Sequence, residues 1–110
     1  MSRQRLEQLL TFLEKSPKEP FILFALAKEY EKLQELDQAL HHYQRLTQDA
    51  PDYVGTYYHL GKLQEQLNNP HAAWKTYSKG MEVARQAGDQ HSLAELAGAR
   101  LELGDEDDFE

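Results

Sequence analysis

The feature that most constrains the fold of this chain is an internal period of 34 residues. When the segment that starts at Pro17 is laid over the segment that starts at Pro51, eight positions carry the same residue. They are Pro17/Pro51, Leu26/Leu60, Lys28/Lys62, Glu31/Glu65, Leu33/Leu67, Ala39/Ala73, Tyr43/Tyr77 and Ala50/Ala84. A fixed period of this length is typical of stacked helical repeats, in which each unit buries its apolar face against its neighbours. The period therefore predicts a repeat architecture for the 110 residues.

The spacing of apolar residues predicts about six helices and no strand. The expected helices cover about 3–15, 20–33, 37–50, 54–67, 70–86 and 89–103. Apolar stripes at helical spacing carry the first and the last of them, namely Leu6, Leu9, Leu10 and Leu13, and Leu93, Leu96, Ala97 and Leu101. The chain is thus predicted to be all-α.

Residues with special backbone or capping properties mark the helix ends. Pro20 suits the first turn of a helix, and Asp37 and Asp89 are the expected N-caps of the third and sixth helices. Asn68 tolerates the left-handed conformation of a tight turn, and Gly88 is the expected stop of the fifth helix.

The two 34-residue units resemble tetratricopeptide repeats, each of which is a helix–turn–helix with small residues and aromatics at fixed places. The first unit supplies Leu23, Leu26, Ala27, Tyr30, Ala39, Tyr43 and the closing Pro51, and the second supplies Tyr57, Leu60, Gly61, Ala73 and Tyr77. The small residues stand where paired helices are expected to cross closely. The pattern departs from the family at Leu23, Gln64 and Arg85, which replace an aromatic, a tyrosine and a proline.

The resemblance implies antiparallel helix–turn–helix repeats stacked as a short right-handed superhelix. The expected single domain, 1–103, consists of a half repeat (3–16), repeat one (17–50), repeat two (51–87) and a capping helix (89–103). In the half repeat Leu9, Phe12 and Pro17 stand where the second helix of a preceding unit would carry its aromatic, its small residue and its proline, whereas Arg5 stands where its alanine should be.

The resemblance also implies a concave groove lined by the first helix of each repeat, where the family generally binds partner segments. Carried over to this chain, the groove residues are Phe21, Phe24, Lys28, Glu31, Tyr58, Lys62 and Glu65. Lys28 and Lys62 are expected to lie side by side, and an aromatic floor with two ammonium groups suits a peptide that carries a carboxylate. Lys28, Lys62, Glu31 and Glu65 are polar, and packing gives them no evident reason to repeat.

Two alternatives stay open for these residues. The lysines are equally consistent with ordinary exposed helix positions, and Phe24 and Tyr58 with packing against the N-terminal helix. The two-carboxylate clamp by which some members of the family bind chaperone tails is not expected, because Phe24, Lys28 and His59 replace its first lysine and its two asparagines.

Nothing in the sequence indicates catalysis, a cofactor or a metal site. The chain has no cysteine, and no phosphate-binding loop, HExxH motif or nucleophile elbow is present. His41 and His42 are adjacent and point about 100° apart on a helix, while the other three histidines stand on different helices without ligand spacing.

Acidic residues are concentrated at the C-terminal end. The net charge is −7, but five of the 19 acids fall within 105–110, so that residues 1–104 carry 14 acids against 12 bases. The segment 104–110 is expected to be disordered, because so acidic a stretch buries little apolar area. No basic stripe indicates nucleic-acid binding, and no apolar run is long enough to span a membrane. The absence of a signal peptide and of cysteine predicts a cytoplasmic protein.

These observations lead to two functional hypotheses. The first is a non-catalytic scaffold that binds a protein or peptide in the groove, as a monomer or a weak homodimer. The alternative is a structural module that self-associates or packs against other domains through Phe12, Leu36, Trp74 or the face of the N-terminal helix.

Overall fold

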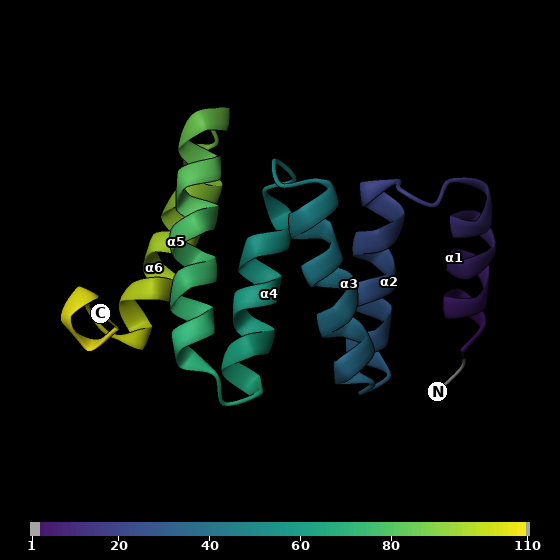
Figure 1. Ribbon diagram of the computed structural model, residues 1–110, viewed down its shortest axis with the longest axis horizontal. Coiled ribbons are helices and arrows are strands. Elements are labelled where there is room, and N and C mark those ends of the chain that lie inside the picture. Colours follow the sequence, from purple (N-terminus) through teal and green to yellow (C-terminus); the bar gives the residue numbers. More distant parts are fainter. Residues whose placement is uncertain (1–2, 110) are drawn as a thin grey trace. The chain divides into compact units, whose positions relative to one another are not determined.

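The computed structural model describes residues 3–109 (Figure 1). Between these residues the chain forms six α-helices, one turn of 3-10 helix and no strand. The elements are α1 (Gln4–Lys15), α2 (Pro20–Lys32), α3 (Leu36–Asp49), α4 (Gly55–Gln66), α5 (Pro70–Ala87), α6 (Gln90–Leu103) and the 3-10 turn η1 (Glu106–Asp108). The predicted all-α class and the predicted helices are confirmed.

The chain divides into two compact units, Met1–Ala50 (unit 1) and Pro51–Glu110 (unit 2). The division falls at the repeat boundary that the sequence places at Pro51. In unit 1 α2 packs on both α1 and α3, and in unit 2 α5 packs on both α4 and α6.

Most helix ends lie where the sequence places them, with one exception. Pro20 occupies the first turn of α2, Gly88 ends α5 in a left-handed conformation, and Asp89 caps α6 by accepting a hydrogen bond from the backbone N–H of Ser92. The prediction that Asp37 caps the third helix is wrong. That helix already begins at Leu36, so Asp37 lies in its first turn, where a carboxylate still interacts favourably with the helix dipole.

The turns inside the two repeats have the same backbone conformation. Gln34 and Asn68, which are 34 residues apart, have φ angles of 62° and 61°. In both turns the residue that follows donates its N–H to a carbonyl five positions back, from Glu35 to Tyr30 and from Asn69 to Gln64, at 2.9 Å. This C-terminal motif satisfies carbonyl groups that the helix leaves unpaired and redirects the chain into the next helix.

In unit 1, the core lies along both sides of α2. Leu6 and Leu9 of α1 pack with Leu26 of α2, and α2 and α3 contribute apolar side chains that are fully buried. The latter are Leu23, Leu26, Ala27, Ala39, Tyr43 and Leu46. The predicted stripe of α1 is correct for Leu6 and Leu9, whereas Leu10 is 37% exposed.

In unit 2, glycine permits the close approach of α4 and α5. A Cβ atom at Gly61 would lie 2.2 Å from Cε1 of the Tyr77 ring, which confirms the predicted close crossing at this small residue. Tyr57, Tyr77, Met81, Val83, Ala84, Leu96 and Ala99 form the core around them. Leu101 was expected on the inner face of the last helix, but it is 73% exposed.

The segment after α6 has a defined conformation, which differs from the predicted disorder. Gly104 has a φ of 145°, a value that favours glycine, and it reverses the chain after Leu103. Asp105 and Asp108 form a capping box around η1, and Phe109 returns to stack on Trp74 of α5. Glu110, the last residue of the predicted tail, lies outside the described residues.

Candidate functional site

Unit 1 brings its four predicted groove residues to one open hollow. Phe21, Phe24, Lys28 and Glu31 of α2 all line a depression of about 810 Å³. Their spacing of three, four and three residues places them on one helical face. The hollow is completed by Arg5 of α1 and by Ala25, Glu29 and Lys32.

The two phenylalanines of this hollow play different parts. Phe21 is 64% exposed, which is unusual for so large an apolar side chain. Phe24 is half-buried, and its ring meets that of Tyr43 from α3 edge to face, with 6.1 Å between the centroids. Phe24 therefore belongs in part to the core, through α3, and Phe21 offers the apolar surface to solvent.

Arg5 is a residue of this site that sequence reasoning did not include. Its Nε lies 3.5 Å from Oε2 of Glu29, whose side chain is only 8% exposed. In the half repeat, Arg5 stands where the repeat pattern has an alanine. This departure from the pattern was the sequence signal that could have drawn attention to Arg5. A long cationic side chain at this point reaches from α1 to the hollow, which an alanine could not do.

The repeated glutamates have a structural reason to repeat, contrary to expectation. The hydroxyl of Tyr43 donates to Oε1 of Glu31 over 2.5 Å, and the hydroxyl of Tyr77 donates in the same way to Oε2 of Glu65. Both tyrosine side chains are fully buried. Burial, and then the hydrogen bond to the carboxylate, raise the pKa of Tyr43 and of Tyr77 well above its usual value.

A second pair of positions, also 12 residues apart, explains why Gln64 replaces the tyrosine of the repeat pattern. In unit 1 the ring of Tyr30 lies 5.2 Å from that of His42. In unit 2 the equivalent positions hold Gln64 and Thr76, and the Thr76 hydroxyl donates to the Gln64 amide oxygen over 2.6 Å. An aromatic contact in one repeat is thus replaced by a hydrogen bond in the other.

In unit 2, two of the three predicted residues of α4 face α6. Tyr58 and Lys62 line a smaller hollow of about 180 Å³ together with residues of α6, which are Ala94, Glu95, Gly98, Ala99 and Glu102. The Nζ atom of Lys62 lies 5.6 Å from the centroid of the Tyr58 ring and 3.8 Å from Oε2 of Glu65. Lys62 therefore lies beside one aromatic ring and one carboxylate of its own helix, whereas the hollow of Lys28 contains two further cations as well as two carboxylates. Their expected position side by side concerns both units and stays a prediction.

The histidines do not form a ligand set within residues 3–109. No group of three histidine, cysteine, aspartate or glutamate side chains there could hold a metal ion. His42 is buried, and its Nδ1 lies 2.8 Å from the carbonyl oxygen of Gln38. Desolvation lowers the pKa of His42, and the nearby His41 and Arg45 act in the same direction, against the backbone hydrogen bond. None of the helices described is both long and apolar enough to cross a bilayer.

The geometry defines a class of protein. Two helix–turn–helix units with a 34-residue period, equivalent turns and equivalent tyrosine–glutamate pairs make this chain a helical repeat protein.

Comparison with solved structures identifies the family. A tetratricopeptide repeat domain protein from Salinibacter ruber, seen in a crystal structure, is 47% identical over 77% of this chain and 94% of its own, with a TM-score of 0.74. A solution NMR structure of a tetratricopeptide repeat domain protein from the same organism is 46% identical over 80% and 89%, with a TM-score of 0.78. A solution structure of a protein from Bordetella parapertussis is 26% identical over 89% and 85%, with a TM-score of 0.76. No protein-family model and no curated protein matches the sequence.

The chain belongs to the tetratricopeptide repeat family. The fold is that of a scaffold for protein–protein interaction, so the partners it suggests are proteins.

Proposed function

We propose that this chain is a non-catalytic scaffold and that the hollow on α2 binds a segment of a partner protein. The observation that carries the proposal is the gathering of Phe21, Phe24 and Lys28 around one depression of about 810 Å³. An exposed apolar side chain beside a hollow that has cationic walls suits a segment with an apolar residue and a nearby carboxylate.

The charges around the hollow favour an anionic group in the partner. Its walls contain the cations Arg5, Lys28 and Lys32 and the carboxylates Glu29 and Glu31, which leaves a formal charge of +1. Arg5 and Glu29 form an ion pair, and Glu31 accepts the hydrogen bond of Tyr43. Lys28 and Lys32 are exposed, and they remain as the cations best placed to meet a carboxylate.

The experiment compares two variants of the hollow, a charge reversal and a truncated phenylalanine, with a charge reversal elsewhere on the chain. Binding is measured on an array of synthetic peptides that differ in their apolar residues and carboxylates. For the peptides that the wild-type chain binds, Lys28→Glu and Phe21→Ala should each weaken binding at least tenfold. Lys75→Glu is the matched control, because Lys75 is exposed on α5 and the net charge changes by the same amount. Circular dichroism should show equal helical content in all three variants. Unchanged binding by both hollow variants would refute the proposal.

The residues of α4 are tested separately. Lys62→Glu should weaken the same peptides if the predicted groove includes α4, and the ion pair of Lys62 with Glu65 makes its effect smaller than that of Lys28→Glu. An effect of Lys62→Glu alone would favour the α4 face over the hollow on α2.

A second candidate function is self-association, and exposed apolar side chains of unit 1 favour it. Of the four large apolar side chains that are most exposed in the described chain, three belong to this unit, namely Leu10, Phe12 and Phe21. Phe12 is 57% exposed on α1. Sedimentation over a concentration range should then show a dimer that dissociates on dilution and that Phe12→Ser abolishes. A monomer at all concentrations excludes this function.

A further inference from the structure

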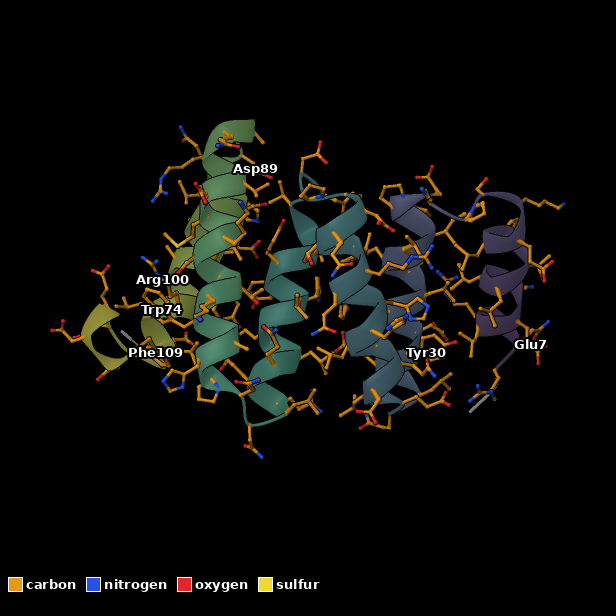
Figure 2. All side chains as sticks on the ribbon, in the orientation of Figure 1. Glu7, Tyr30, Trp74, Asp89, Arg100 and Phe109 are labelled. Carbon is orange, nitrogen blue, oxygen red and sulfur yellow. The ribbon has the colours of Figure 1, made fainter. Side chains whose placement is uncertain are left out.

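A second surface, separate from the α2 hollow, lies in unit 2 where α5, α6 and the C-terminal segment meet. Its centre is Trp74 of α5, the only tryptophan in the chain. The guanidinium of Arg100 from α6 lies over the indole ring at 5.0 Å from its centroid. Phe109 stacks on the same indole, with the ring centroids 5.8 Å apart and the planes inclined by 15°. Trp74, Arg100 and Phe109 are labelled in Figure 2. We call the surface formed by His71, Trp74 and Arg100 the Trp74 surface.

Phe109 is held from two sides by residues of α5. Besides stacking on Trp74, its ring meets the His71 ring nearly edge to face, at a centroid distance of 5.2 Å and an angle of 70°. Offset-stacked and edge-to-face contacts are the favourable arrangements of aromatic pairs. An aromatic side chain is therefore the chemistry that this surface accepts.

The charges of the Trp74 surface suit what precedes Phe109. Arg100 lines a hollow of about 350 Å³ together with Asp105 and Glu106 of the C-terminal segment. Arg100 is itself fixed, because its Nη1 donates to the hydroxyl of Ser78 over 2.9 Å and its guanidinium rests on Trp74. The positive charge of Arg100 attracts nearby acidic residues even without an ion pair, so this surface favours an aromatic residue that follows acidic ones.

The segment is attached only loosely to this surface. Residues 105–108 are exposed, and within the described chain they form no ion pair with Arg100. The hydrogen bonds of the capping box, such as that from the Asp105 N–H to Asp108 Oδ2 at 3.0 Å, shape the segment itself without joining it to α5 or α6. The binding of the C-terminal segment to the Trp74 surface therefore depends mainly on Phe109. A competing segment has to displace little more than the contacts of this one ring.

We propose that the Trp74 surface is a binding site for a partner's acidic segment that ends in an aromatic residue, and that residues 105–109 occupy the site in its absence. The C-terminal segment thereby acts as a built-in competitor. This site is independent of the hollow on α2, which contains no residue of the Trp74 surface.

The single tryptophan gives a direct measurement. In the full chain, Phe109→Ala should expose the indole of Trp74 and shift its fluorescence emission to longer wavelength. Phe21→Ala is the matched control, because it removes an exposed phenylalanine from the other unit and should leave the emission unchanged.

Binding is then tested with a synthetic peptide that has the sequence of residues 104–110. The peptide should bind the Phe109→Ala chain saturably, reversing the emission shift, and should bind the wild-type chain at least tenfold more weakly because its own segment competes. A peptide in which alanine replaces the phenylalanine should not bind. Arg100→Gln in the Phe109→Ala background should weaken binding several-fold and reduce its dependence on salt.

Two results would overturn the proposal. One is an emission spectrum that Phe109→Ala leaves unchanged, together with no saturable response to the peptide. The other is a wild-type emission that changes with protein concentration in step with dimerisation in sedimentation, since a second copy would then supply the segment in place of a partner.

Discussion

Gly61 and Gly80 let α4 and α5 approach each other closely, and Gly61→Ala tests how tightly these helices pack. The new Cβ would lie 2.2 Å from Cε1 and 2.6 Å from Cζ of the Tyr77 ring, whereas carbon atoms pack favourably at about 3.5–4.0 Å. The ring cannot move aside easily, because Tyr77 is fully buried and its hydroxyl is bound to Glu65. The helices must therefore separate, or the ring must give up its hydrogen bond.

Two effects of opposite sign determine the change in stability. Overpacking of a well-packed core costs about 1–3 kcal/mol, and an overlap of more than about 1 Å belongs at the upper end of that range. Replacing a glycine by alanine inside a helix gains about 1 kcal/mol. Gly61→Ala should therefore lower the free energy of unfolding by about 2 kcal/mol, which corresponds to a fall in Tm of about 8 °C.

Gly98 offers a control that contains only the second effect. It lies inside α6, is exposed, and has no neighbouring atom within 4 Å of the place that a new Cβ would take. Gly98→Ala should stabilise the chain by about 1 kcal/mol. Urea unfolding followed by circular dichroism compares both variants with the wild type. If Gly61→Ala is as stable as the wild type or more stable, the reasoning from close packing is refuted.

Three further predictions concern unit 1. Tyr43→Phe should lower the free energy of unfolding by about 1 kcal/mol, because it removes the hydrogen bond that the Tyr43 hydroxyl donates to Glu31; an unchanged midpoint of urea unfolding would contradict this. The lowered pKa of His42 means that the unfolded chain binds the proton more readily, so the free energy of unfolding should fall as the pH drops below about 6.5. The His42→Gln variant should lack this part of the pH dependence. If the free energy of unfolding of the variant and of the wild type changed in parallel between pH 5 and 8, the assignment of this effect to His42 would be wrong. Gln34→Gly should raise Tm, since it relieves a left-handed conformation that costs about 1 kcal/mol or more outside glycine, and an unchanged or lower Tm would count against it.

The course of the helices could be predicted because its signals are local. Proline at the first turn of α2, the Asn68 turn and the Gly88–Asp89 boundary each act on the backbone within a few residues. Asp37 misled the prediction for a related reason. The preceding turn, with Gln34 in the left-handed region, had already started α3 at Leu36.

The candidate site was predictable only in part. Helical spacing correctly places Phe21, Phe24 and Lys28 on one face, because that property belongs to a single helix. It could not supply Arg5, which comes from α1, or show that Phe24 also contacts α3. These facts depend on how helices pack, and a one-dimensional pattern contains no distances between helices.

The spacing of apolar residues and the 34-residue period together predict the all-α repeat fold and its division at Pro51, and the period places a small residue, Gly61, where α4 and α5 cross closely. The tertiary structure decided what each repeated polar residue does. Glu31 and Glu65 repeat because each accepts a hydrogen bond from a buried tyrosine 12 residues further on, whereas Lys28 and Lys62 repeat in sequence but have different surroundings. It also decided that Phe109 packs on Trp74, although composition predicted disorder. The physical reason is that a period records which positions are equivalent, while partners 12 or 35 residues apart are fixed by the packing of separate elements.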